Sequence, residues 1–495
     1  MTPPATLSAL RAAMADFPPL EAHTAARPIE LSEIYYPRAH AAALDPERSL
    51  VIGNRGMGKS FWANALVNPS TRSQIAIQFP ESRLGLGPID IEYGFAEGEG
   101  NVGVSRDELK VAADAGASVE AIWRAVTLPS IARLSRKHVP DSLSDRLKWI
   151  ETNPGDVRDV LRGADHALTA KSGRLVFVFD QLEQLSDDVE RRSSLIQGVL
   201  RLALAYKSYR NIRLKIFMRP DQRADARLFQ FPDASKISGE AVELDWRPED
   251  LYGLLYTRLR QAAPGEFTTL VDEIWQSDVS PAVPAAEIEK LKALRQSAVV
   301  QRHVFDRLAG PYMGTNRRRG LTYSWLVLHL ADSRNQVSPR TFLRAIKFAA
   351  ERQPAPTDTA IDYRGIYHGV NKAAENRVDD LKEDYPWVPP ALEQLKGLLV
   401  PCDPEEMMAR WRDPSVLQRL RNATPPSKMP GWLSEADDDM NAAPGHLLAA
   451  MATIGVVERR ETTGKVDVPD IFRLPDDIRR KGGVTPQQRR TARLG

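Results

Sequence analysis

The segment at residues 51–62, VIGNRGMGKSFW, constrains the fold of this chain more than any other stretch of the sequence. It matches the pattern GxxxxGK[ST] in full, directly after an apolar run that favours a strand and before a segment, KSFWANAL, that favours a helix. Strand, glycine-rich loop and helix in this order bind phosphate, because backbone N–H groups and the positive end of the helix both face the anion. A glycine-rich turn that merely joins a strand to a helix is the alternative, and the full motif in this context disfavours it.

The loop also predicts which residues hold a nucleotide. Lys59 is expected to reach the β- and γ-phosphates of ATP, and Ser60 is expected to bind Mg²⁺. The other predicted contacts to the nucleotide lie in the loop and the first helical turn: Gly53, Asn54, Arg55, Gly56, Met57, Gly58 and Phe61.

An acidic element that suits this loop occurs in GRLVFVFDQLEQL, where an apolar run ends at Asp180. We expect Asp180 to hold the metal ion together with Ser60. Glu183, three residues later, can polarise the attacking water as a general base. The alternative for Glu183 is an exposed residue near a helix N-terminus, where the helix dipole favours an acid. No NKxD signature for guanine occurs, which lowers the prospect of a GTPase.

Two arginines are candidate sensors of the γ-phosphate. Arg219 ends the next apolar run, RLKIFMR, and Arg340 follows Pro339, a residue that suits the first turn of a helix. For each of them the alternative is an ordinary surface arginine. Arg223 and Arg227 are weaker candidates for reaching the nucleotide of a neighbouring subunit.

The pattern along the chain predicts an α/β fold, with a parallel sheet between helices, followed by a helical lid domain and a small C-terminal winged-helix domain. The apolar runs SLVIGN, SQIAIQF, RLVFVFD, RLKIFMR and EAVELDW alternate with helical segments, and 495 residues exceed the size of one core. Near the C-terminus, a helix followed by two apolar strands around RRETTGKVD is typical of a winged helix. The predicted parts are an N-terminal helical arm (1–47), a P-loop ATPase core (48–262), a helical lid (263–355), a helical linker domain (356–430), a winged-helix-like domain (431–478) and a basic flexible tail (479–495).

Local charge, rather than net charge, suggests partners. The chain has 67 lysines and arginines against 65 aspartates and glutamates, a formal net charge of +2. Basic residues gather in the winged helix and the tail, so DNA is a candidate partner there, and docking of a protein is the alternative. A single cysteine, Cys402, and the lack of a twenty-residue apolar run predict a cytoplasmic protein that makes no membrane contact.

Taken together, the motifs resemble the AAA+/STAND portion of the additional-strand P-loop ATPases over residues 48–480. The resemblance rests on the P-loop, FDQLE, KIFMRPD and LDWRPEDLYGLLYTRL, followed by the helical lid and the winged helix. It implies that ATP and Mg²⁺ bind between core and lid, commonly in an oligomer, and that hydrolysis switches the conformation. The second acid stands at Glu183 rather than next to Asp180, which departs from the usual AAA+ pattern and predicts slow, switch-like hydrolysis.

Two functions remain open from the sequence. In the first, the chain is a homo-oligomeric ATPase switch or motor that controls a partner effector protein, as many bacterial relatives of this layout do in anti-phage and other conflict systems. In the second, it is a DNA-binding AAA+-like regulator of the origin-recognition or transposition type. No nuclease, protease or deaminase motif is recognisable, so an effector would be a separate chain. Salt-dependent DNA binding would discriminate between the two.

Overall fold

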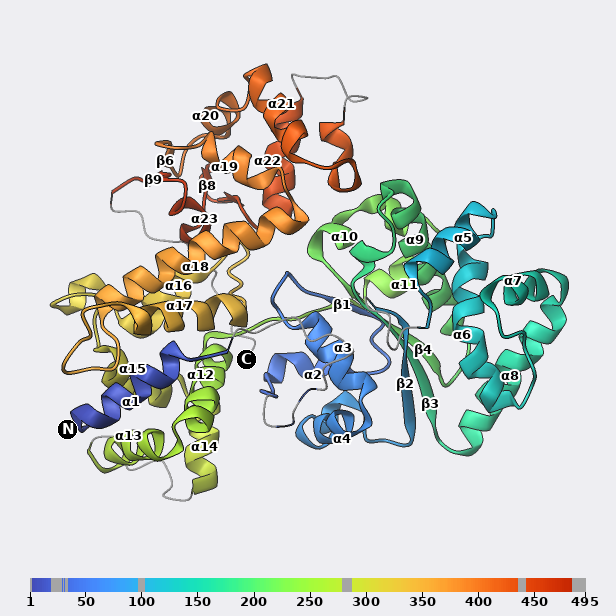
Figure 1. The fold of residues 1–495 in the computed structure, drawn as a ribbon, viewed down its shortest axis with the longest axis horizontal. Helices are drawn as coiled ribbons and strands as arrows, with labels where there is room; N and C mark the ends of the chain where they lie inside the picture. The colour runs from blue at the N-terminus through green and yellow to red at the C-terminus, as the bar shows by residue number, and fades with distance from the viewer. Residues whose placement is uncertain are drawn as a thin grey trace. The chain divides into compact units, whose positions relative to one another are not determined.

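The structure, a computed structural model, describes residues 2–18, 29, 31, 34–96, 103–277, 287–434 and 442–482. The chain divides into two compact units, one of residues 21–245 and one of residues 1–20 together with 246–495. The first unit is built on a five-stranded sheet, and the second is mainly helical (Figure 1). We call them the sheet unit and the helical unit.

The sheet unit has five parallel strands in the order β2-β3-β4-β1-β5. The strand that precedes the P-loop, β1, is separated by β4 from β3, the strand that precedes Asp180. The predicted α/β class with a parallel sheet is confirmed. The strands are β1 (Leu50–Ile52), β2 (Ile89–Phe95), β3 (Arg174–Phe179), β4 (Ile212–Met218) and β5 (Val242–Glu243).

Helices cover both faces of this sheet (Figure 1). Helix α3 packs on one face, and α6, α8 and α9 pack on the other. The α-helices of the unit are α2 (Ala41–Leu44), α3 (Lys59–Val67), α4 (Pro69–Gln78), α5 (Arg106–Asp114), α6 (Val119–Ser135), α7 (Leu143–Thr152), α8 (Pro154–Ala170), α9 (Val189–Tyr206), α10 (Pro220–Ala224) and α11 (Ser235–Ser238).

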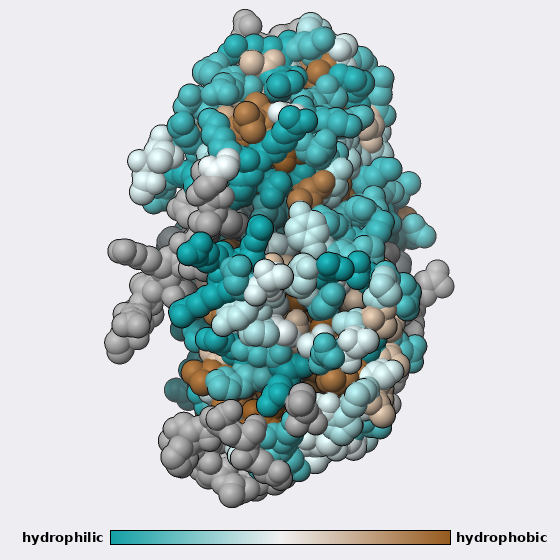
Figure 2. Space-filling view, turned by 90° about the vertical axis from the view of Figure 1, so that its left-hand side faces the viewer, coloured by the Kyte–Doolittle hydropathy of each residue, from teal (hydrophilic) through white to brown (hydrophobic). Residues whose placement is uncertain are grey.

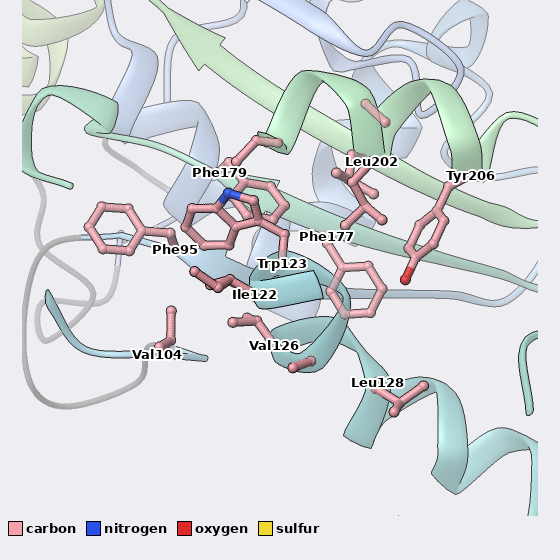
Figure 3. Close-up of a cluster of buried hydrophobic side chains, with 14 of the residues drawn as sticks. Phe95, Val104, Ile122, Trp123, Val126, Leu128, Phe177, Phe179, Leu202 and Tyr206 are labelled. Atoms are coloured by element: carbon pink, nitrogen blue, oxygen red, sulfur yellow. The ribbon is translucent and has the colours of Figure 1, made fainter. Parts of the chain in front are cut away.

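An aromatic cluster anchors β3, the strand that carries Asp180 at its end (Figure 3). The ring of Trp123 lies edge-on to that of Phe179 at 5.4 Å and to that of Phe95 at 6.4 Å. The indole N–H of Trp123 donates to the carbonyl of Leu195 at 2.8 Å, so the buried polar atom of this large side chain is satisfied. Such packing fixes the strand end from which the functional residues project.

One predicted strand is wrong, and one strand was missed. SQIAIQF belongs to helix α4, because Asn68 caps that helix by accepting from the N–H of Ser70 at 2.9 Å and Pro69 suits its first turn. Ile75 and Phe79, four residues apart, are buried whereas Ile77 is 64% exposed, so the inward positions of this run follow the period of a helix rather than that of a strand. The missing strand is β2, whose sequence IDIEYGF carries charged and glycine residues between its apolar ones.

The helical unit includes both ends of the described chain. Helix α1, from the predicted N-terminal arm, packs on α12, α13 and α17. The predicted boundary at residue 262 places α12 with the ATPase core, whereas the buried side chains of α12 contact α13, α14, α15 and α17. The helices are α1 (Pro4–Ala15), α12 (Pro248–Ala262), α13 (Pro264–Ser277), α14 (Glu287–Gln296), α15 (Ala298–Ala309), α16 (Thr322–Leu330), α17 (Pro339–Glu351) and α18 (Tyr363–Asp384).

The C-terminal part of this unit contains the predicted helix and hairpin. Helix α22 is followed by β7 and β8, which pair antiparallel, and β9 pairs parallel with β6. The tail predicted to be flexible from residue 479 therefore begins with an ordered strand, and residues 483–495 lie outside the described residues. The elements are α19 (Val388–Glu393), β6 (Leu399–Val400), α20 (Pro404–Ala409), α21 (Pro414–Ala423), α22 (Ala443–Thr453), β7 (Glu458–Arg459), β8 (Val466–Asp467), α23 (Asp470–Arg473) and β9 (Arg479–Arg480).

The surface facing the viewer in Figure 2 is mainly hydrophilic, and its hydrophobic residues form small, separate groups. In the described ranges, every helix is too short or too polar to cross a lipid bilayer.

Candidate functional site

The P-loop has the conformation that its glycines allow. β1 ends at Ile52, and α3 begins at Lys59. Between them, Gly56 has φ 82° and Gly58 has φ 101°, a left-handed region that side chains with a Cβ atom rarely adopt. The loop thus turns sharply and delivers the N-terminus of α3 to the carboxyl edge of the sheet, where parallel α/β sheets bind their ligands.

Lys59 lies over the loop that precedes it. Its ammonium donates to the carbonyl of Gly53 at 2.8 Å and to that of Asn54 at 3.3 Å. These bonds hold the positive charge at the loop, in position to neutralise a phosphate that the same backbone would hold. The loop and this lysine therefore form one preorganised anion-binding element.

Asp180 connects the end of β3 to the P-loop helix. It is 2% exposed, and it accepts a hydrogen bond from the hydroxyl of Ser60. Burial raises the pKa of Asp180 to about 6, although the Ser60 hydrogen bond and the charge of Lys59 oppose this rise. Its Oδ1 atom is buried and has no hydrogen-bond partner among the described residues.

These features fit a magnesium ion. A buried carboxylate with an unsatisfied oxygen gains from a nearby cation, and Ser60 adds a second hard oxygen ligand. Mg²⁺ is usually bound through one or two carboxylates plus phosphate and water oxygens, rather than by a closed protein cage. The described ranges contain no group of three or more His, Cys, Asp or Glu residues that could hold a metal.

Glu183 lies one turn beyond Asp180, in the 3-10 helix η4 (Leu182–Gln184), which begins seven residues before helix α9 at Val189. Gln181 makes the turn with φ 55°, a left-handed conformation that is uncommon for a residue other than glycine and costs on the order of 1 kcal/mol. The Oε1 atom of Glu183 is 3.9 Å from the Nη1 atom of Arg219. The strained turn therefore directs Glu183 to the end of the neighbouring strand.

Arg219 follows β4, between the other two strand ends. Its side chain is 12% exposed, and its Nε atom is 3.5 Å from Asp221 Oδ1. Arg192 on α9 lies close enough to Arg219, Glu183 and Asp221 to interact with their charges. Burial lowers the pKa of Arg192, and the positive charge of Arg219 lowers it further. The negative charges of Glu183 and Asp221 raise this pKa and so oppose the other two effects. Sequence reasoning missed Arg192, because one arginine on an arginine-rich helix carries no signal of its own.

A hydrogen bond between Trp62 and His40, which the sequence did not reveal, anchors the P-loop helix α3. The indole N–H of Trp62 donates to Nδ1 of His40 at 2.9 Å, so His40 carries its proton on Nε2 and donates it to the carbonyl of Asp245 at 3.0 Å. Burial lowers the pKa of His40 to about 3, which keeps it neutral. This chain of bonds ties α3 to the segment that follows β5.

The structure thus brings together the predicted P-loop residues with Asp180, Glu183 and Arg219. Arg340 occupies the first turn of α17, as predicted, behind the cap made by Ser338. It belongs to the helical unit, and its role as a second sensor stays a prediction.

The two candidate arginine fingers have partners within their own chain. Arg223 donates to the carbonyl of Ser238 at 3.1 Å, and Arg227 forms an ion pair with Asp225 at 2.8 Å. Their action on a neighbouring subunit also stays a prediction.

No protein-family model matches this chain, and no curated protein matches it in sequence. Among solved structures, it is similar to the ORC1 protein of Aeropyrum pernix in complex with DNA, with 13% identity, a TM-score of 0.30 and coverage of 93% of both chains. It is also similar to the ORC2 protein of Aeropyrum pernix in ADPNP–ADP complexes, with 12% identity, a TM-score of 0.28 and coverage of 91% of this chain and 96% of that one.

Proposed function

We propose that this chain is an AAA+-type ATPase that binds ATP with Mg²⁺ at the P-loop and hydrolyses it slowly. The hydrogen bond between Ser60 and Asp180, beside Lys59, carries this proposal. It joins two motifs that are far apart in the sequence into one phosphate- and metal-binding geometry. A glycine-rich turn without a ligand would not need a buried, unsatisfied carboxylate at the same place.

Each residue then has a chemical role. The loop N–H groups and Lys59 hold the phosphates, and Ser60 and Asp180 would hold Mg²⁺, which supplies positive charge beside the β- and γ-phosphates when bound. Glu183 accepts the proton of the attacking water. Its present neighbour, Arg219, attracts its carboxylate and so competes with a water at the γ-phosphate for it. This supports slow hydrolysis and a role for Arg219 in sensing that phosphate.

The wider role follows as part of the proposal. An ATPase with slow turnover is suited to holding one conformation until its nucleotide changes. We therefore propose a switch, assembled as a homo-oligomer with Arg340 as the second sensor, that controls a partner effector protein in a bacterial defence-type system. The lack of any other recognisable catalytic motif in the sequence supports a separate effector chain.

A DNA-binding regulator is the second candidate. Arg459, Arg479 and Lys481 are exposed in the C-terminal part of the helical unit, and Lys465 is half-buried beside them. They could contact DNA phosphates without any rearrangement of the fold.

The substitution Glu183→Gln tests the proposed hydrolysis. The amide keeps the shape of the side chain but cannot accept the proton, so hydrolysis should fall by roughly 10²- to 10⁴-fold while ATP still binds. Phosphate release measures the rate, and calorimetry measures the binding. Glu190→Gln, at an exposed position on α9, is the matched control and should retain the parental rate. Parental turnover in Glu183→Gln would assign the base to another residue, and loss of ATP binding would make Glu183 structural.

A further inference from the structure

The loop between α15 and α16 in the helical unit is an ordered turn that presents three consecutive arginines. Tyr312 and Leu321 form an antiparallel bridge at its base, and the N–H of Met313 donates to the carbonyl of Gly320 at 2.9 Å. At its tip, the 3-10 helix η6 (Arg317–Arg319) is capped by Asn316, whose side chain accepts from the N–H of Arg318 at 3.0 Å. The turn is therefore formed in advance, which lowers the entropy cost of using it for binding.

The charges of this turn are not used inside the protein. Arg317, Arg318 and Arg319 are all exposed, and none of them forms an ion pair with a described residue. The sequence from residue 307 to residue 331 contains no aspartate or glutamate. Three cations thus lie together on a short turn that itself carries no acid, and such a concentration of positive charge attracts a polyanion.

Aromatic side chains continue from the base of the turn onto the neighbouring helices. Gly320, which follows the arginines, lies against Trp325, since a Cβ atom placed on Gly320 would be 3.7 Å from Cδ1 of that ring. Trp325 on α16 stacks on His329, with ring centroids 3.8 Å apart. The ring of Tyr367 on α18 lies 5.9 Å from that of Trp325 and is 53% exposed.

From this juxtaposition we propose that the arginine turn and the adjoining aromatic rings bind single-stranded nucleic acid. Guanidinium groups neutralise backbone phosphates, and exposed rings stack with unpaired bases, which a duplex does not offer. An acidic protein could pair with the arginines, but that partner would not explain why Tyr367, a large aromatic residue beside Trp325, is exposed to water. The surface differs from the nucleotide site and from the basic C-terminal hairpin.

The test compares two variants in titrations of a labelled oligodeoxythymidine strand, followed by fluorescence anisotropy at several salt concentrations. Replacing Arg317, Arg318 and Arg319 together by alanine should flatten the slope of log K against log salt by about 2, since each lost contact to a single strand contributes about 0.7. Tyr367→Ala should weaken binding on the order of tenfold and leave the slope unchanged, because stacking releases no counterions.

The matched control removes three exposed cations elsewhere, with Arg158, Arg162 and Lys171 changed to alanine on and beside α8. It should keep the parental affinity and slope. Thermal unfolding establishes that every variant is folded. The proposal is overturned if the arginine variant keeps the parental slope, or if the control loses as much. It is also overturned if polyglutamate competes as well as the oligonucleotide and Tyr367→Ala has no effect, a result that would identify an acidic protein partner.

Discussion

Two buried aspartates, one in each unit, illustrate two uses of a buried charge. Asp180 is 2% exposed and Asp467 is 1% exposed. The carboxylate of Asp467 pairs with Arg460 and with Arg480, whose Nη2 atom is 3.4 Å away, and it accepts from the N–H of Val468 at 2.9 Å. Asp180 has the hydroxyl of Ser60 and one oxygen without a partner among the described residues.

The difference shows how a structural charge can be distinguished from one kept for a ligand. Burying a carboxylate is costly unless cations and hydrogen bonds compensate it within the fold. Asp467 is compensated in this way and serves stability, whereas one oxygen of Asp180 has no such partner among the described residues, as expected of the Mg²⁺ ligand that we propose. The same contrast corrects part of the prediction for DNA contacts. Arg460 and Arg480 belong to the basic residues of the winged helix and tail that made DNA a candidate partner, but they form ion pairs with Asp467 and Asp470.

The largest effect is expected at Asp467. Asp467→Ala would leave two nearly buried guanidinium groups without their shared partner, so the free energy of unfolding of the helical unit should fall by about 3–5 kcal/mol. Urea titration measures this change. Asp358→Ala, at an exposed site in the same unit, is the control and should stay within about 0.5 kcal/mol of the parent. Equal stability of the two variants would mean that the ion pairs contribute nothing to the fold.

At the nucleotide site, Lys59→Ala should affect binding rather than folding. The ammonium donates to the carbonyls of Gly53 and Asn54 in its own loop, and it would face the phosphates of ATP in the complex. Its loss should weaken ATP binding by about 2–5 kcal/mol, a factor of roughly 30 or more, as measured by calorimetry with Mg²⁺. Lys110→Ala, at an exposed position on α5, should bind ATP as the parent does. Unchanged affinity in Lys59→Ala would refute the nucleotide site.

Asp180→Asn should stabilise the protein in the absence of nucleotide. The pKa of Asp180 in the folded chain is about 6, above its ordinary value of 3.8, so the parent loses stability as the pH rises through that interval. The amide does not titrate, and it should add up to about 3 kcal/mol to the free energy of unfolding above pH 6, with little gain below pH 4. Urea titrations at about pH 4.5 and about pH 7.5 measure the difference.

The same variant should lose ATP hydrolysis, because the amide is a poorer ligand for Mg²⁺. More stability with less activity is the behaviour expected of a functional residue. If Asp180→Asn destabilises the protein at both pH values, Asp180 is a structural residue, and the contrast with Asp467 disappears.

The sequence predicts the nucleotide site better than it predicts the C-terminal part. Asp180 and Arg219 end apolar strands, and parallel strands bring their carboxyl ends to one edge, so local patterns are enough to place these residues together. The partners of Arg460 could not be predicted, because an arginine beside a strand pairs with an acid or stays exposed according to tertiary packing alone. Sequence reasoning also missed β2, with its interrupted apolar pattern, and the bond from Trp62 to His40, which joins segments without a shared motif.

The smallest change in stability is expected at the basic residues of the C-terminal hairpin that remain outside the ion-pair network. Arg459→Ala combined with Lys465→Ala should change the free energy of unfolding by no more than about 0.5 kcal/mol. If this hairpin binds DNA, the slope of log K against log salt for a duplex should flatten by about 2, from two lost phosphate contacts, while ATP binding stays intact. Truncation after Leu474 is the poorer test, because it removes β9 and the Arg480 partner of Asp467 and so disturbs the fold itself. Equal duplex affinity and an equal slope in the double variant and the parent would favour protein docking by the hairpin.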